Sequence, residues 1–346
     1  MEIGVYSFGR APTTDPGPLG PTARALADLL EAVRLADEVG LDYFGVGEHH
    51  TRAMPVSAPG AFLSAIGAAT RQIRMGSTVT VLGTDDPVRV YQQHATAWAV
   101  SGGRVDLTVG RGSSIDSFPL FGYDVSEYDA LFADKLDLLL QINRSERVTW
   151  SGRSRAPLED ALVVPRVPGG LTIWLGTGGN PGSCVRAGML GLPLAFGILS
   201  GTTEEWVQRA DLYRESAARS GHDQAGLDIA VASHGFVARD PTDARDRFHR
   251  HENEAFADYA LEHGGQLGGG RSRHAFDVDA APGGMVFAGG AEEVAERLIA
   301  FHRALGHSRH ILQMDLGHID QREVLDAIEL LGTVVAPLVR AETGGA

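Results

Sequence analysis

Residues 40–50 of this chain read GLDYFGVGEHH, and the interpretation of the other segments starts from this stretch. Residues 43–47 are small and apolar, which is typical of a short buried strand. Glu48, His49 and His50 follow directly, at the carboxyl end of that strand. Ligands bind at this end of the strands in parallel α/β folds, and imidazoles beside a carboxylate can move protons near neutral pH. The stretch therefore indicates an active-site edge; a hydrogen-bonded loop pair or an accidental metal site are the alternatives.

The composition excludes several classes of protein. The chain has 346 residues, 43% of them hydrophobic, and a formal net charge of −14. This acidity, without any Lys/Arg run, argues against a nucleic-acid partner. The single cysteine, Cys184, excludes an intrachain disulfide framework or a multi-cysteine zinc site and suits a reducing cytoplasm. No apolar run approaches the roughly 20 residues that span a bilayer, and no signal-peptide pattern opens the sequence. We expect a cytoplasmic protein without a membrane partner.

Strand and helix patterns alternate along the chain. Strand patterns lie near residues 3, 43, 73, 105, 172, 193, 229 and 310, and helical periodicity separates them. Alternation of this kind favours βα units around a parallel sheet. Eight such units predict an α/β fold of the (β/α)8 type, a TIM barrel with insertions, formed by residues 1–346 as one domain. A doubly wound open sheet is the second possibility.

Two segments interrupt the alternation and are predicted to be insertions. Residues 144–170 are polar and rich in Pro, Arg and Gly. Residues 241–285 begin as Asp/Arg/His-rich helical sequence and continue through a cluster of glycines. A long segment of this kind, close to the end of a strand, is a candidate lid over a site. A surface excursion without fixed structure fits the composition equally well.

Two further loops that follow strands carry ligand-binding chemistry. Residues 110–113 read Gly-Arg-Gly-Ser, and residues 176–180 read Gly-Thr-Gly-Gly-Asn, with Ser183 one turn further on. Glycines allow the backbone to approach a ligand, and the N–H groups at a helix start favour an anion. Arg111 adds a permanently charged guanidinium. The pattern predicts a phosphate site, although a tight strand–helix turn would have the same sequence.

A dinucleotide site fits these loops less well. The G-x-G-x-x-G pattern that starts at Gly176 is interrupted by Pro181, and the next strand does not end in the acidic residue that binds a ribose. A lone phosphate on a bulky aromatic group fits better. A flavin mononucleotide and a sugar phosphate both meet that description.

Several other polar residues are weaker candidates. His249, His251 and His263 are predicted to lie on the surface of the second insertion, and His234 is predicted to be packed or hydrogen-bonded within a strand. The last strand ends in residues predicted to point to the rim: Gln313, Asp315 and His318. No metal site is predicted, because adjacent histidines usually point in different directions and no metal-binding spacing is present.

With these loops in place, the sequence resembles the bacterial luciferase-like family of flavin-dependent oxidoreductases over nearly its whole length, roughly 1–340. The segments that carry the resemblance are GLDYFGVGEHH at 40–50, DPVR at 86–89, SGGRVDLTVGRG at 101–112, IWLGTGG at 173–179 and GLPL at 191–194.

The resemblance implies a fold, a cofactor and a set of site residues. The fold is again the eight-stranded barrel, usually as a dimer. Reduced FMN would bind at the carboxyl rim and would be supplied by a separate NAD(P)H-flavin reductase. By position, His49 is the expected catalytic histidine, with Glu48 and His50 beside it. The expected flavin-binding residues are Thr78 and Val79, where the family often has a non-prolyl cis peptide under the flavin ring, and then Arg111, Gly178, Gly179, Asn180 and Ser183 around the phosphate.

One departure from the family pattern narrows the expected reaction. Gly110 stands where luciferase itself has a reactive cysteine, so a light-emitting reaction on a long-chain aldehyde is not expected. The leading hypothesis is an FMN-dependent monooxygenase that uses dioxygen on a small organic substrate. Hydride transfer with the deazaflavin F420 is the second hypothesis, and a flavin-binding protein without catalysis is the third.

Overall fold

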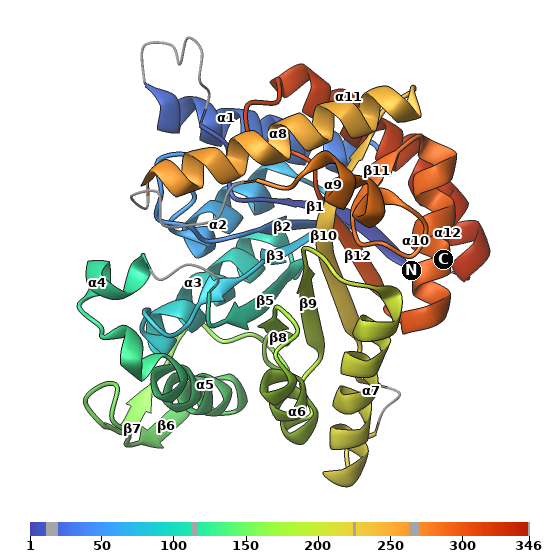
Figure 1. Ribbon diagram of the computed structural model, residues 1–346. Coiled ribbons are helices and arrows are strands. Elements are labelled where there is room, and N and C mark those ends of the chain that lie inside the picture. The colour runs from blue at the N-terminus through green and yellow to red at the C-terminus, as the bar shows by residue number, and fades with distance from the viewer. Residues whose placement is uncertain (12–19, 113–115, 224–225, 263–269, 345–346) are drawn as a thin grey trace.

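A parallel barrel surrounded by helices forms the centre of the molecule (Figure 1). The computed structural model describes residues 1–11, 20–112, 116–223, 226–262 and 270–344. Within these residues eight parallel strands close on themselves, each bonded to the next and the last to the first. The barrel strands are β1 (Glu2–Ser7), β2 (Tyr43–Val46), β3 (Arg74–Ser77), β5 (Val105–Gly110), β8 (Ile173–Thr177), β9 (Leu194–Ile198), β10 (Ile229–Val237) and β12 (Arg309–Gln313). The predicted TIM barrel is confirmed, and the alternative prediction of a doubly wound open sheet is wrong.

Helices that follow the strands cover the outside of the barrel. They are α1 (Pro21–Glu38), α2 (Pro59–Ala69), α3 (Pro87–Ser101), α5 (Tyr128–Arg144), α6 (Pro181–Leu190), α7 (Thr203–Arg219), α10 (Ala291–Leu305), α11 (Gln321–Leu330) and α12 (Ala336–Thr343). Local sequence sets several of their starts. Asp86 accepts hydrogen bonds from two backbone N–H groups of α3 ahead of a proline, and Thr202 and Asp320 form capping boxes. No described helix is long and apolar enough to cross a membrane.

The interior of the barrel changes in character along its axis. Tyr6, Tyr43, Ala232 and Ile311 form a small apolar cluster inside it, and Phe8 packs on this cluster from the carboxyl side. Because side chains alternate along a strand, the opposite faces of the same strands pack against the helices. Nearer the carboxyl ends several strand positions are glycine, and at Gly197 an added Cβ would meet no atom within 4 Å.

The two predicted insertions contain regular structure. Residues 144–170 include an antiparallel hairpin of β6 (Arg147–Trp150) and β7 (Leu158–Leu162), which is anchored where the indole of Trp150 donates to Asp137 over 2.8 Å. A short helix, α4 (Ser117–Phe121), was not anticipated from the sequence.

The second insertion places a long helix across the strand ends. Residues 241–285 form α8 (Pro241–Glu262) and α9 (Arg273–Ala280), and β11 (Phe287–Gly289) then extends the sheet beside β10. Near its carboxyl end α8 reaches the loop after β2, where the Glu262 carboxylate accepts from the backbone N–H groups of Arg52 and Ala53 over 3.0 Å. The part of the predicted lid at 263–269 lies outside the described residues.

The predicted strand at 73–82 is divided. It comprises β3 and a two-residue strand, β4 (Thr80–Val81), and the Thr78–Val79 peptide bond between them is cis. The cis bond lies where the family resemblance led us to expect one. The predicted closing helix at 321–339 likewise consists of two α-helices joined by a π-helical turn at Leu331–Val335.

Candidate active site

Glu48 links the loop after β2 to β4. One carboxylate oxygen accepts from the backbone N–H of Val81 over 2.9 Å, and the other lies 3.0 Å from Nε2 of His50. The His50 ring meets the ring of Phe121 on α4 edge to face, with 5.4 Å between their centres. Glu48 and His50 therefore form a fixed pair that faces α4.

His49 points to a different side. It is buried, and its ring meets Phe8 of the strand-1 loop edge to face at 4.6 Å and Tyr259 of α8 at 6.3 Å. Its backbone N–H donates to the carbonyl of Val56 over 2.9 Å, which fixes the turn of the loop. The three consecutive residues thus separate into two groups. Glu48 and His50 form a pair, whereas His49 faces Phe8 and Tyr259, which we call the aromatic wall beneath α8.

A cavity of about 190 Å³ lies beside the pair, between the starts of α2 and α3. Glu48, Thr80, Asp85, Gln93 and Phe121 contribute to its lining. Burial raises the pKa of the Asp85 carboxyl, and the nearby negative charge of Glu48 raises it further. The cavity is therefore an acidic space at the side of the mouth.

Thr78 and Val79 pack against glycines of three strands at the rim. A Cβ atom added to Gly110 or to Gly176 would lie 2.6 Å from the Val79 side chain, and one added to Gly45 would lie 2.3 Å from the hydroxyl of Thr78. Only glycine fits at such distances. The predicted residues Thr78 and Val79 thus lie against β2, β5 and β8 and close the interior below the mouth.

Arg111 joins the loop after β5 to the first turn of α6. One guanidinium nitrogen donates to Ser183 Oγ over 3.2 Å, another forms an ion pair with Asp129, and the plane lies 5.1 Å from the centre of the Tyr128 ring. These three partners fix the position of the guanidinium, whose planar donors are of the kind that bind carboxylates and phosphates. The structure therefore brings together Arg111 and Ser183, two residues assigned to the phosphate from the sequence.

Asn180 caps α6 and shapes the turn before it. Its side-chain oxygen accepts from the backbone N–H of Ser183 over 3.1 Å, and its own N–H donates to the hydroxyl of Thr177 over 3.2 Å. These bonds hold the turn in one conformation and place the Ser183 hydroxyl beside Arg111.

Gly179 and Gly178 are glycines for different reasons. Gly179 has φ +88°, and a Cβ there would lie 2.8 Å from the ring of Trp206 and 2.9 Å from Nε of Arg209. At Gly178 the nearest atom to an added Cβ is the carbonyl oxygen of Gly197, 4.0 Å away. The backbone at Gly178 is thus accessible to a ligand, whereas Gly179 is needed for the turn itself.

Arg209 is a site residue that sequence reasoning missed. It lies on α7, stacks 5.1 Å from the Trp206 ring and donates from Nε to the carbonyl of Gly179 over 3.0 Å. It therefore supports the turn at Gly178–Asn180 through its backbone. No local pattern in α7 marks it, because only the packing of α7 against α6 brings the two together.

The histidines of the second insertion differ from the expectation. His251, predicted on the surface, is buried and lies 2.7 Å from a carboxylate oxygen of Glu254. His249 is half-buried, with Nε2 2.8 Å from the carbonyl of Arg271. That prediction was wrong because α8 packs on the 271–280 segment and on the loop after β12. His263 lies outside the described residues.

Of the residues at the end of β12, some lie at the mouth of the barrel and others lie between the strands and the surrounding helices. Asp315 is half-buried, lines a space with residues of α1 and α11 and accepts a hydrogen bond from Ser7, so it does not point to the mouth as expected. His318 lies 2.8 Å from a carboxylate oxygen of Asp258 on α8. Gln313 occupies the same side of its strand as the interior residue Ile311 and so belongs to the mouth.

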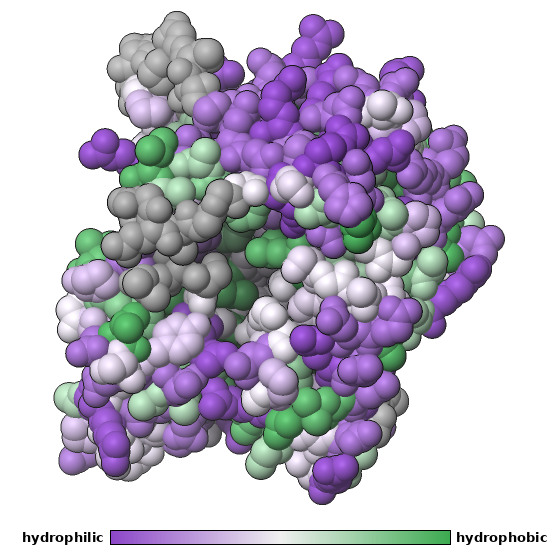
Figure 2. All heavy atoms as spheres, in the orientation of Figure 1, coloured by the Kyte–Doolittle hydropathy of each residue, from purple (hydrophilic) through white to green (hydrophobic). Residues whose placement is uncertain are grey.

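Figure 2 shows a recess below α8, with hydrophobic residues in its walls. His49, Val79, Arg111 and Asn180 lie at the carboxyl ends of β2, β3, β5 and β8, which are consecutive neighbours in the barrel. Their order places the imidazole and the turn capped by Asn180 on one rim, with Val79 between them. Such an arrangement suits an elongated ligand with a flat ring and a charged tail.

Comparison with known proteins gives a consistent result. A family model described as luciferase-like monooxygenase matches residues 1–308. The chain is 27% identical over 243 residues to 4-hydroxyprotoasukamycin monooxygenase of Streptomyces nodosus subsp. asukaensis, a match that covers 66% of this chain and 64% of that protein. It is 31% identical over 230 residues to F420-dependent glucose-6-phosphate dehydrogenase of Beutenbergia cavernae, covering 63% of this chain and 66% of the other. Both matches thus span slightly less than two thirds of the relative's length.

The same architecture is found in a solved structure. The monooxygenase RslO1 from Streptomyces bottropensis superposes with a TM-score of 0.83, at 21% identity, over 97% of this chain and 99% of that one. This similarity bears on the fold alone.

Proposed function

This chain belongs to the luciferase-like monooxygenase family, and on that basis we propose that it is a flavin-dependent monooxygenase. In this proposal the cofactor is reduced FMN, the oxidant is dioxygen, and the substrate is a small organic molecule. A separate NAD(P)H-flavin reductase supplies the reduced flavin, and the protein acts as a homodimer in the cytoplasm. The observation that carries the proposal is the meeting of Arg111 and Ser183 at the helix turn capped by Asn180.

The donors at this turn suit the phosphate of FMN. Arg111 offers a charged guanidinium, Ser183 a hydroxyl, and the open backbone at Gly178 a close approach. Charge-assisted hydrogen bonds to such donors contribute about 1.5–3 kcal/mol each. Asp129, which pairs with Arg111, is exposed and can turn to solvent when an anion binds.

The glycine positions suit the ring of the flavin. Gly110 and Gly176 lie against Val79, and an added Cβ at Gly197 would meet no atom within 4 Å. A flat aromatic system needs such a wall of backbone on one side and open space on the other. We infer that the ring lies between Val79 and the space over Gly197, with its phosphate end toward Arg111.

The protein groups around that position have distinct tasks. Reduced flavin supplies the electrons that activate dioxygen. His49, held between Phe8 and Tyr259, gives or takes a proton during the reaction, and the aromatic wall beneath α8 excludes water. Glu48 and His50 hold the loop of His49 in place through their bond to β4 and their contact with α4.

Hydride transfer with F420 is the second candidate, because one relative is an F420-dependent dehydrogenase. The two candidates make different predictions in an anaerobic titration followed by exposure to oxygen. For the monooxygenase, reduced FMN binds, and the complex consumes oxygen with kinetics that differ from those of free reduced FMN. Preferential binding of reduced F420, with no oxygen consumption, would favour the dehydrogenase instead.

A further inference from the structure

A histidine and a glutamate outside the predicted site form a buried pair beside the mouth. Nδ1 of His234, on β10, lies 2.8 Å from a carboxylate oxygen of Glu252 on α8. Glu252 is fully buried, and 8% of the His234 side chain remains exposed. Because a carboxylate accepts, the imidazole donates from Nδ1, and Nε2 is left as an acceptor. In the neutral imidazole, this contact assigns the proton to Nδ1 of a histidine that the sequence analysis did not place in the flavin site.

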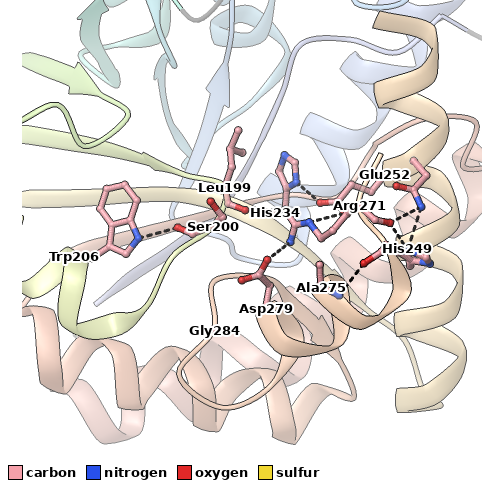
Figure 3. Close-up of polar contacts among 12 residues, drawn as sticks. Leu199, Ser200, Trp206, His234, His249, Glu252, Arg271, Ala275, Asp279 and Gly284 are labelled. Carbon is pink, nitrogen blue, oxygen red and sulfur yellow. Dashed lines mark hydrogen bonds and ion pairs between the residues drawn. The ribbon is translucent and has the colours of Figure 1, made fainter. Parts of the chain in front are cut away.

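A network behind Glu252 holds it in place (Figure 3). The guanidinium of Arg271 lies 3.4 Å from Glu252, 2.9 Å from Asp279, and donates to the carbonyl of Leu199 over 2.8 Å. Nε2 of His249 and the amide of Asn253 both donate to the backbone carbonyl of Arg271, over 2.8 and 3.1 Å, and so fix the backbone of that segment. One cation therefore faces two carboxylates, and the excess negative charge lies behind the His234 ring.

The other edge of the His234 ring faces the mouth. Two residues earlier, Ala232 packs inside the barrel with Tyr6, and Phe8 covers that cluster. Strand alternation places His234 on the same side, one layer nearer the rim. Nε2 makes no hydrogen bond to a described residue, and the exposed 8% of the His234 side chain leaves part of the ring open to the mouth. Figure 3 shows this edge of the ring turned away from Arg271, on the side of Leu199.

We propose that His234 is a second acid–base residue of this site, which takes a proton from a hydroxyl group on an aromatic or enolic substrate. The oxygenation that would follow this proton transfer rests on the proposed function, whereas the proton transfer itself does not. In that transfer the substrate O–H bond breaks, the proton binds to Nε2, and its electron pair stays on the oxygen. Glu252 faces the imidazolium that results, as the carboxylate does in a hydrolase triad.

The surroundings of His234 indicate this class of substrate. With Nδ1–H committed to Glu252, Nε2 can accept a hydrogen bond but cannot donate one, so it selects an O–H donor over a carbonyl or an anion. The space over Gly197, on the neighbouring strand, is open, and Leu199 at the end of that strand is an exposed hydrophobic side chain. A flat, largely apolar molecule with one acidic hydroxyl fits these features. Loss of the proton makes such a ring electron-rich and hence easier to oxygenate.

Binding of 4-nitrophenol to the flavin-free, full-length protein tests the proposal, because ionised and neutral forms of this phenol differ in colour. At a pH about one unit below its own pKa, about one tenth of the free phenol is ionised. The wild-type protein is expected to shift the ionisation equilibrium of the bound phenol by at least about tenfold toward the phenolate, and His234→Gln is expected to abolish that shift. Glu252→Gln should reduce it, because the imidazolium then loses the facing charge.

Two controls separate proton transfer from packing. His222→Gln changes a histidine outside this network, whose Nε2 lies 2.9 Å from the carbonyl of Met189, and it should leave the shift unchanged. Binding of 4-nitroanisole, which has no O–H, should be equal in all four proteins. Failure of the wild type to bind or ionise the phenol, or persistence of the shift in His234→Gln, would overturn the proposal. A separate titration with FMN reports on the flavin, so the two proposals fail independently.

Discussion

The guanidinium of Arg111 donates to the hydroxyl of Ser183, over 3.2 Å, across the gap between β5 and α6. This bond ties a strand-end loop to the first turn of a helix. It also places a permanent positive charge beside a hydroxyl group at the edge of the mouth. The phosphate end of a flavin would lie there.

Replacement of Arg111 should therefore affect FMN and riboflavin differently. Loss of one charge-assisted bond costs about 1.5–3 kcal/mol, which corresponds to about tenfold to a hundredfold in affinity. Arg111→Ala should weaken FMN binding by that factor and leave riboflavin, which has no phosphate, nearly unchanged. Fluorescence titrations with both flavins measure this. Equal losses for the two would show that Arg111 acts on the fold of the loop and not on a phosphate.

Gly179 should be much less tolerant of alanine than its neighbour Gly178. Gly179 has a positive φ, and a Cβ would contact Trp206 and Arg209, whereas Gly178 has open space. A residue forced into such a conformation costs on the order of 1–3 kcal/mol. Gly179→Ala should lower the free energy of unfolding by that amount in denaturant titrations, and the control Gly178→Ala by much less. Equal stabilities would contradict the described turn.

His49→Asn should separate binding from turnover. The imidazole lies between Phe8 and Tyr259 and away from the phosphate turn, so FMN affinity should be retained. Oxygenation should fall by about 10²–10⁴-fold, the usual contribution of a positioned acid or base. His222→Asn, a change near the exposed end of α6, serves as the control. Unchanged turnover in the His49 variant would remove this residue from the mechanism.

The ionised carboxylate of Asp315 should lower the free energy of unfolding at neutral pH. Burial raises the pKa of its carboxyl from 3.8 to about 6, against the opposing hydrogen bond from Ser7. The native state thus favours the protonated form, and stability falls as the pH rises from 4 through 6, by about 3 kcal/mol in total. At pH 4 the free energy of unfolding of Asp315→Asn should equal or fall below that of the wild type. By pH 7 the variant should have gained stability relative to the wild type. Urea titrations at both pH values measure this; a difference that does not change with pH would be contrary to it.

His94 should make the protein sensitive to acid. Burial lowers the pKa of its imidazole from 6.5 to about 4, although the hydrogen bond to Val90 opposes this. The unfolded chain therefore binds a proton first, and stability is lost as the pH falls below 6.5, by about 3 kcal/mol near pH 4. His94→Gln should flatten the dependence of unfolding free energy on pH in this range. Parallel curves for variant and wild type would exclude His94 as the source.

The barrel was predictable from the sequence because each βα unit has its own local signals. Buried strands such as 43–46 are short apolar runs, and Asp86 and Asn180 stand where side-chain caps begin helices. The break at Thr78–Val79 was anticipated only from the family resemblance. The division of 73–82 into two strands was not anticipated, because β-branched residues continue through the break from Thr78 to Val81.

The site was predictable in part for the same reason. Arg111, Asn180 and Ser183 follow strands directly, so the topology alone brings them to one rim. Arg209 and Glu252 come from helix interiors, and their roles depend on which face of α7 or α8 turns inward. The sequence placed Glu48, His49 and His50 side by side, but only the packing of α4 and α8 shows that they face different neighbours.

A crystal structure of the complex with FMN tests the central claim most directly. We predict the phosphate within hydrogen-bond distance of the Arg111 guanidinium and the Ser183 hydroxyl, and the flavin ring against Val79 with His49 beside the same space. A flavin whose phosphate lies away from Arg111, or a ring outside the mouth that His49 faces, would contradict the account.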